Sequence, residues 1–215
     1  MEGSFLYNVV RNSCAVFLYT YSRLRASGRH NIPRCGGFIM AANHVSYLDP
    51  PALAAACPRH MSYMGRDTLF GNRFLGWVFK NVSVFPLKRN SADFGALKEA
   101  LRRLKNGDGL LLFPEGTRSP DGKIARGLAG VAFLARKSGV PVVPARVDGS
   151  ERAMPKTSKW IAPFRIRVVF GEPFVFRQGK YASDQDFVAE VMSRIAALKP
   201  TVDNKGVFAD NDNSQ

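Results

Sequence analysis

The chain has 215 residues, of which 46% are hydrophobic, so it can form one domain with a sizeable core, or one domain with a small appendage. Its 31 basic and 17 acidic residues give a formal net charge of +14, which points to anionic partners such as nucleic acid, a phospholipid surface or a phosphorylated substrate. The three cysteines are odd in number and form no Cys-X-X-Cys pair, which favours reduced thiols in a cytosolic environment.

The N-terminal segment has the pattern of an amphipathic helix. Apolar residues recur at helical spacing across residues 5–24, but the polar tripeptide at 11–13 interrupts them, so no apolar run reaches the roughly 20 residues that span a bilayer. Glu2 stands where a secretory signal has a basic start, and no cleavage site follows. We expect residues 1–30 to form a helical segment at the membrane interface, and packing against the domain is an alternative that does not exclude this.

A histidine follows the first predicted strand. Residues 36–42 form a short apolar run that is typical of a strand buried on both faces, and the prolines at 50–51 indicate the start of a helix. His44 is therefore expected at the carboxyl end of a buried strand, where open α/β sheets bind their ligands. The Asp49 carboxylate can fold back onto one imidazole nitrogen and leave the other as a base, although an aspartate before two prolines also suits a helix N-cap.

The following region continues the alternation of strands and helices. We expect a strand over 59–64, a helix over 67–79, a strand over 82–85, and a helix over 91–106 that Ser91 caps. The aromatic residues of the helix at 67–79 suit either the protein core or a lipid surface.

A second apolar strand, residues 109–113, runs directly into the sequence Pro-Glu-Gly-Thr-Arg-Ser at 114–119. If both apolar strands belong to one parallel sheet, they deliver the pair of His44 and Asp49 and an arginine beside a Gly-Thr turn to the same edge. An imidazole base beside an anion site suits acyl or phosphoryl transfer.

The C-terminal third completes the predicted fold. We expect a helix over 128–138, a central strand over 140–147, a loop over 148–164, a strand nearer the sheet edge over 164–170, and a helix that a capping box opens at Ser183. The sequence therefore predicts a single α/β domain over 31–200, with a mostly parallel sheet covered by helices on both faces. The N-terminal amphipathic helix precedes this domain, and residues 201–215 form a polar, flexible tail.

Four blocks of this sequence resemble the glycerolipid acyltransferase family, in particular the 1-acylglycerol-3-phosphate (lysophosphatidic acid) acyltransferases. The blocks are NHVSYLD at 43–49, FPLKR at 85–89, FPEGTRS at 113–119 and VPVVPA at 140–145, and they extend over about half of the chain. The first and third blocks together are highly specific, and the other two are loose. Residues 120–126 depart from the longer, lysine-containing loop that the family often has there, and this concerns the rim of the acceptor pocket.

The resemblance implies an enzyme that moves a fatty acyl group from an acyl thioester, either acyl-CoA or acyl carrier protein, to the free hydroxyl of 1-acylglycerol-3-phosphate. The product is phosphatidic acid, an intermediate of phospholipid synthesis. In this reading His44 is the general base, and Asp49 orients it and stabilises the imidazolium, which is the HX4D motif of the family. The reaction needs no covalent intermediate, no metal and no cofactor, because the thioester co-substrate is already activated.

The resemblance also implies an acceptor site around the second and third blocks. Residues expected to hold the acceptor phosphate are Arg89, Gly116, Thr117 and Arg118, since a planar guanidinium matches phosphate oxygens. Glu115 is expected to accept a hydrogen bond from a glycerol hydroxyl or to orient an arginine. A surface charge without function is the alternative for Arg89.

Other functions remain open at this point. The acceptor is alternatively another lysophospholipid, a lyso-aminolipid or glycerol-3-phosphate, and a different class of function is a non-catalytic basic module that binds membranes. The basic residues are dispersed and match no nucleic-acid-binding motif, so we expect no nucleic-acid partner. We expect a peripheral or monotopic protein on the cytoplasmic face of an anionic membrane, and the sequence leaves the donor, the acyl chain length and the oligomeric state undetermined.

Overall fold

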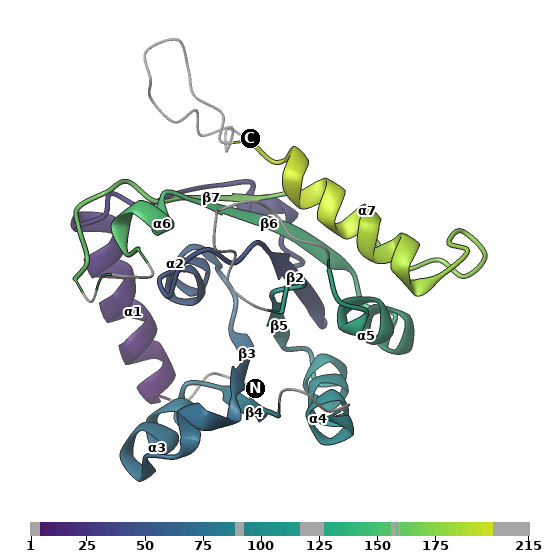
Figure 1. The fold of residues 1–215 in the computed structure, drawn as a ribbon, viewed down its shortest axis with the longest axis horizontal. Helices are drawn as coiled ribbons and strands as arrows, with labels where there is room; N and C mark the ends of the chain where they lie inside the picture. Colours follow the sequence, from purple (N-terminus) through teal and green to yellow (C-terminus); the bar gives the residue numbers. More distant parts are fainter. Residues whose placement is uncertain (1–4, 89–92, 117–126, 156–157, 159, 200–215) are drawn as a thin grey trace.

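The structure is a computed structural model that describes residues 5–88, 93–116, 127–155, 158 and 160–199. The described residues form a seven-stranded sheet in the order β1-β7-β6-β2-β5-β3-β4 (Figure 1). The strands are β1 (Arg25–Ser27), β2 (Phe38–Ala42), β3 (Met61–Arg66), β4 (Val84–Leu87), β5 (Gly109–Leu112), β6 (Val142–Asp148) and β7 (Arg167–Phe170). Only β6 and β7 pair antiparallel among the described strands, so the prediction of a mostly parallel sheet is confirmed.

Helices cover both faces of the sheet, as predicted (Figure 1). One face carries α1 (Phe5–Thr20), α2 (Asp49–Ala56) and the short α6 (Ser150–Ala153), and the other carries α4 (Phe94–Lys105), α5 (Gly130–Ser138) and α7 (Asp184–Ala197). The remaining helix, α3 (Arg73–Asn81), lies next to the edge strand β4. Two 3-10 turns, Arg29–Asn31 and Asp67–Phe70, complete the described elements.

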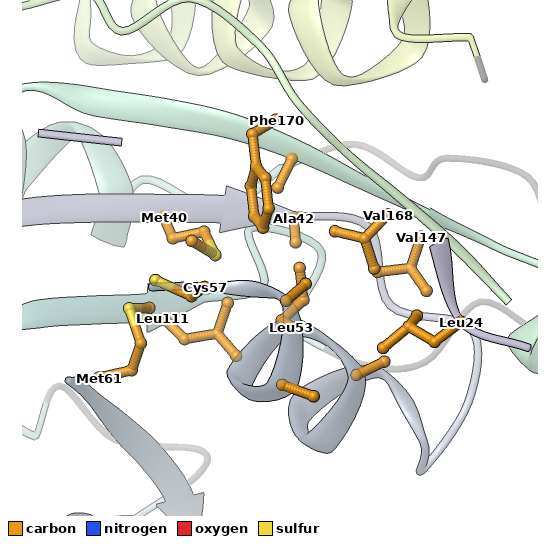
Figure 2. Close-up of a cluster of buried hydrophobic side chains, with 14 of the residues drawn as sticks. Leu24, Met40, Ala42, Leu53, Cys57, Met61, Leu111, Val147, Val168 and Phe170 are labelled. Atoms are coloured by element: carbon orange, nitrogen blue, oxygen red, sulfur yellow. The ribbon is translucent and has the colours of Figure 1, made fainter. Parts of the chain in front are cut away.

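The central strand β2 explains why the core has two halves. Its side chains alternate, so that Phe38, Met40 and Ala42 join the cluster beneath α1 and α2, while Ile39 and Ala41 join the cluster beneath the other helices. Figure 2 shows Met40 and Ala42 of the first cluster between Phe170 and the helix α2. All five residues of β2 are fully buried, which agrees with the continuous apolar run that predicted this strand.

Several predicted elements differ in detail. The helix expected over 67–79 is a 3-10 turn followed by α3, because the Asn72 side-chain oxygen accepts hydrogen bonds from two backbone N–H groups and starts a new helix there. The short strand β1 was not predicted, and it takes the sheet edge beyond β7. The predicted loop 148–164 contains α6. Asp93 caps α4 through the N–H of Ala96, while Ser91, the predicted cap, lies outside the described residues.

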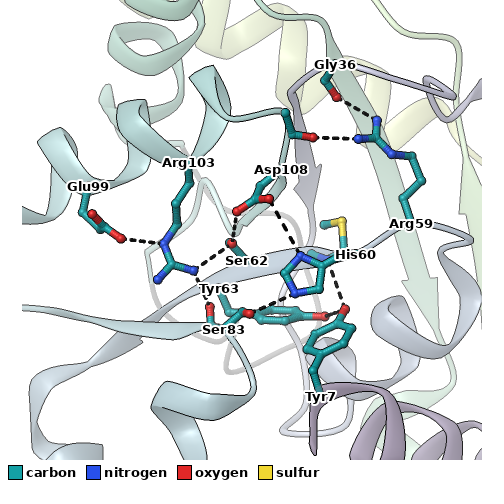
Figure 3. Close-up of polar contacts among 12 residues, drawn as sticks. Tyr7, Gly36, Arg59, His60, Ser62, Tyr63, Ser83, Glu99, Arg103 and Asp108 are labelled. Atoms are coloured by element: carbon teal, nitrogen blue, oxygen red, sulfur yellow. Dashed lines mark hydrogen bonds and ion pairs between the residues drawn. The ribbon is translucent and has the colours of Figure 1, made fainter. Parts of the chain in front are cut away.

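The N-terminal helix is anchored on the domain by two long side chains. The buried Tyr7 hydroxyl accepts a hydrogen bond from the N–H of Met61 at 3.0 Å, and its ring packs on His60 at 4.2 Å between centroids. Figure 3 shows Tyr7 beside the buried polar network that His60 and Asp108 belong to. The Arg11 guanidinium points inward and donates to the carbonyls of Ala54 and Cys57 at the end of α2. Arg11, the one charged residue of α1, therefore holds the helix against α2 through hydrogen bonds.

Candidate active site

His44 and Asp49 meet at the carboxyl edge of the sheet, where the sequence predicts them. His44 follows the central strand β2, whose neighbours are β5 and β6. The imidazole Nδ1 lies 2.8 Å from the Asp49 Oδ2 atom. A carboxylate only accepts hydrogen bonds, so Nδ1 carries the proton and, in the neutral ring, Nε2 keeps its lone pair.

Asp49 is a member of the site and does not cap α2 in the usual way. Its Oδ2 atom accepts hydrogen bonds from the N–H groups of Val45 at 2.7 Å and Ser46 at 2.8 Å, which precede the helix. The residues directly after it are prolines without an N–H group. Its Oδ1 atom accepts from the Ser150 hydroxyl at 2.5 Å, and the carboxylate is 0% exposed. These bonds fix the orientation of the carboxylate toward His44.

The strand β6 holds the loop that carries His44. The Asn43 side chain donates to the Val147 carbonyl at 2.9 Å and accepts from the Val147 N–H at 2.8 Å. The Ser46 hydroxyl donates to the carbonyl of Met154, just beyond α6. Polar contacts with the end of β6 and with the residue after α6 therefore hold the loop in place.

The third sequence block lies beside the histidine, as expected from two adjacent parallel strands. The Phe113 ring stacks on the His44 ring at 4.0 Å between centroids, with 16° between the planes. Glu115 is buried, and its Oε1 atom accepts a hydrogen bond from the main-chain N–H of His44 at 3.2 Å. Gly116 has a φ angle of 67°, and a Cβ atom there would lie 2.5 Å from the Leu128 side chain. Glycine therefore adopts this left-handed turn with less strain than other residues.

Three predicted site residues, Arg89, Thr117 and Arg118, lie outside the described residues. The structure thus brings together His44, Asp49, Glu115 and Gly116. The structure shows that Glu115 accepts a hydrogen bond from the His44 main chain, and a contact between Glu115 and an acceptor stays a prediction.

A large, mainly apolar cavity begins at the histidine. Its volume is about 850 Å³, at the upper end of the range for ligand pockets. His44, Tyr47 and Phe113 line it near the sheet edge. The other walls come from α1, α2, the 3-10 turn Asp67–Phe70, α3, β3, β4 and β5, with Val10, Ala54, Tyr63, Leu69 and Phe79 among the lining residues. The site therefore places an imidazole nitrogen beside a space that suits a long apolar chain.

A known protein family matches the segment that contains this site. Residues 23–148, which include both His44 and Asp49, match the family described as Acyltransferase. The chain belongs to this acyltransferase family. Its matched segment ends at the last residue of β6, directly before Gly149.

The acyltransferase is similar to several named proteins. It is 27% identical over 170 residues to 1-acyl-sn-glycerol-3-phosphate acyltransferase of Bacillus subtilis, which covers 78% of this chain and 82% of that protein. It is 29% identical over 128 residues to lyso-ornithine lipid O-acyltransferase of Pseudomonas aeruginosa, which covers 59% of this chain and 47% of that protein. The crystal structure of the 1-acyl-sn-glycerophosphate acyltransferase PlsC from Thermotoga maritima superposes with a TM-score of 0.71 at 26% identity, over 91% of this chain and 83% of that one. The acyltransferase spans about half the length of the chloroplast relatives that it matches.

Two further observations on the acyltransferase concern membrane-spanning helices and metal ligands. Within the part of the chain that the structure describes, every helix is too short or too polar to cross a bilayer. Within the same part, no three His, Cys, Asp or Glu side chains gather as ligands for a metal ion.

Sequence reasoning missed one polar member of the site, Ser150. The residue is fully buried and follows Gly149 at the carboxyl end of β6. Its only signal in the sequence is a serine three residues after the strand predicted at 140–147, at the same sheet edge as His44. A single serine after a strand is too common to identify a site by itself.

Proposed function

We propose that this acyltransferase moves a fatty acyl group from an acyl thioester to the free hydroxyl of 1-acylglycerol-3-phosphate and thereby forms phosphatidic acid for phospholipid synthesis. The observation that carries the proposal is the His44–Asp49 pair, 2.8 Å apart, at the head of an apolar cavity of about 850 Å³. Acyl-CoA and acyl carrier protein are both suitable donors, because both present the same thioester.

The proposed chemistry is a direct transfer. His44 Nε2 takes the proton of the acceptor hydroxyl while the oxygen attacks the thioester carbonyl, and the resulting tetrahedral intermediate expels the thiolate. The thiolate then takes the proton from the imidazolium, which restores the base. Asp49, fully buried and negatively charged, stabilises the imidazolium between the two steps. General base catalysis of this kind accelerates a reaction by roughly 10²–10⁴.

We assign the acyl chain to the apolar cavity. Every methylene removed from water stabilises the bound chain by about 0.8 kcal/mol, so that a long acyl group is held firmly without polar contacts. The cavity lining as a whole is mainly apolar, although Arg11 of α1 belongs to it, and Tyr63 and Leu111 line the cavity along the strands, before the carboxyl edge that carries His44.

The acceptor phosphate is assigned to the segment that continues from Gly116, with Arg118 as its main ligand and Arg89 as a second one. This assignment rests on the family motif and on the position of Gly116, which lines the same cavity as His44. Arg118→Ala is expected to lower kcat/KM for the phosphate-bearing acceptor roughly tenfold to a few hundredfold, the value of a charge-assisted contact. Arg118→Lys recovers only part of this loss, because an ammonium group cannot bind in a bidentate manner.

Acceptors with and without the phosphate provide the control for Arg118. An acceptor without a phosphate is expected to react poorly with the wild type and little worse with Arg118→Ala. An equal loss on both acceptors assigns the residue to the donor or to the fold, and the phosphate assignment is then wrong.

A lyso-aminolipid is the second candidate acceptor, and the similarity to the lyso-ornithine lipid enzyme of Pseudomonas aeruginosa favours it. A panel of lyso-acceptors, each assayed with one acyl-CoA and one acyl carrier protein, separates the two acceptors and the two donors. His44→Ala in the same panel tests the catalytic function itself, because a non-catalytic membrane module shows no thioester consumption that depends on an acceptor.

We further propose that the enzyme acts on the cytoplasmic face of an anionic membrane, through the outer faces of α1 and α3. On α1 the side chains of Val9, Val16 and Phe17 are exposed, and on α3 those of Phe74 and Trp77 are exposed. Both helices line the cavity, so a membrane on this side delivers a lipid directly to it. The net charge of +14 adds an attraction that added salt weakens.

Matched point variants test the membrane surface better than truncation does, because deleting α1 also removes the anchors Tyr7 and Arg11. We expect Val16→Asp and Phe74→Asp to reduce co-sedimentation with anionic vesicles. Phe94→Asp is the control, since Phe94 is as exposed as Phe74 (75% and 70%) but belongs to α4 on the other face. Equal binding by all three variants contradicts the assignment of the surface.

A further inference from the structure

The Asp49 carboxylate receives its hydrogen bonds from two different parts of the chain. Its Oδ2 atom accepts three N–H groups of its own loop, from His44 Nδ1, Val45 and Ser46. Its Oδ1 atom accepts the hydroxyl of Ser150, at 2.5 Å, from a residue 101 positions later in the sequence. Both side chains are 0% exposed, so water does not replace this bond.

Local backbone geometry places the Ser150 hydroxyl at the carboxylate. Gly149 has a φ angle of 86°, and a Cβ atom there would lie 2.2 Å from the Arg165 carbonyl oxygen, so only glycine allows this turn. Ser150 then begins α6, and the other end of this helix is tied to the same loop by the bond from Ser46 to Met154. The serine thus faces Asp49 from a rigid support.

We infer that Ser150 is a positioning residue for the catalytic pair, which rests on the proposed role of His44 as the base. A carboxylate turns about its Cβ–Cγ bond, and this rotation exchanges the directions of Oδ1 and Oδ2. The Ser150 hydroxyl pins Oδ1 on one side, so that Oδ2 stays directed at the imidazole Nδ1. Among the described residues, Ser150 is the hydrogen-bond donor to Oδ1 of Asp49. Without the Ser150 hydroxyl this buried, charged oxygen lacks a donor.

The kinetic test compares Ser150→Ala with Ser22→Ala. Ser22 is a matched control, because it is equally buried and its hydroxyl has no hydrogen-bond partner within the described part of the chain. Ser150→Ala is expected to lower kcat roughly tenfold to a hundredfold, the value of one hydrogen bond to a charged group, with KM unchanged. Ser22→Ala keeps the wild-type kcat. An unchanged kcat in Ser150→Ala overturns the inference.

A double-mutant cycle shows whether Ser150 acts through Asp49. In an Asp49→Ala background, Ser150→Ala is expected to change kcat less than about twofold, because the carboxylate that it positions is absent. An equal loss in both backgrounds overturns the inference. Ser150→Cys provides a nearly isosteric variant with a weak donor, in case the alanine variant does not fold, and a wild-type kcat in this variant also overturns it.

A spectroscopic arm needs no substrate, so it separates a failure of this inference from a failure of the proposed function. With ¹⁵N-labelled histidine, the wild type and Ser22→Ala are expected to show one sharp Nδ1-bound proton for His44, assigned by its loss in His44→Ala. In folded Ser150→Ala or Ser150→Cys this signal broadens or disappears through exchange with solvent. A sharp, unchanged signal in both Ser150 variants overturns the positioning role whether or not acyl transfer is observed.

Discussion

Replacing either member of the histidine–aspartate pair by alanine is expected to abolish most turnover, but only one replacement strongly destabilises the fold. Asp49→Ala removes the acceptor of the buried N–H groups of Val45 and Ser46. A buried donor without a partner costs about 1–3 kcal/mol, so the two together cost about 2–6 kcal/mol. His44→Ala removes one hydrogen bond and one stacking contact, about 1–3 kcal/mol, and leaves the carboxylate its other three donors.

These values translate into different melting temperatures. For a chain of this size 1 kcal/mol corresponds to roughly 2–4 °C, so Asp49→Ala is expected to lower Tm by roughly 5–20 °C and His44→Ala by about half as much. Differential scanning calorimetry, together with kcat on the preferred acceptor, measures both properties. Near-wild-type turnover in His44→Ala refutes the mechanism. A Tm of Asp49→Ala equal to that of His44→Ala refutes the structural reasoning about the carboxylate.

Three further predictions concern other parts of the molecule. Arg11→Met keeps the aliphatic stem but loses the hydrogen bonds to the end of α2. It is expected to lower the free energy of unfolding, measured in urea, by about 1.5–3 kcal/mol, and an unchanged free energy means that these hydrogen bonds do not stabilise the fold. Burial lowers the pKa of His60 below its ordinary 6.5, so near pH 6 the unfolded chain binds more protons than the folded chain, and stability falls as the pH drops below about 6.5. His60→Gln is expected to flatten the dependence of Tm on pH between pH 5 and 7, and an unaltered dependence contradicts this. Ala54→Phe fills part of the apolar cavity, and if it keeps about two methylenes of the acyl chain out of the cavity, it lowers kcat/KM for long-chain thioesters roughly tenfold. An equal loss on short-chain thioesters means that the cavity does not bind the acyl chain.

The sequence predicts the central part of the fold well because its signals there are strong and local. The apolar runs at 36–42 and 109–113 are too short for helices, and they are adjacent parallel strands in the structure, with Ala41 opposite Leu112. Two parallel strands end at the same edge of a sheet, so the meeting of His44 with residues 113–116 also followed from the sequence. The close contact of His44 and Asp49 follows from their spacing around a short turn.

The features that were missed depend on contacts between distant segments. The strand Arg25–Ser27 is short and polar, and its extended conformation comes from pairing with β7. Ser150 and the anchoring of Tyr7 on Met61 join residues that are 101 and 54 positions from their partners. No local pattern of apolar or polar residues reports such contacts, because they depend on how the helices pack on the sheet.

The support of the His44 loop by β6 and α6 sets the order in which the site is completed during synthesis of the chain. The loop leaves the ribosome 101 residues before Ser150 does, which corresponds to roughly 5–20 s of translation. For most of this interval the nascent chain contains the histidine and the aspartate but neither the strand that holds Asn43 nor the serine that holds the carboxylate. A chain interrupted before Val147 therefore carries the catalytic side chains without the contacts that orient them, and we expect it to consume acyl thioesters far more slowly than a chain that includes β6 and Ser150.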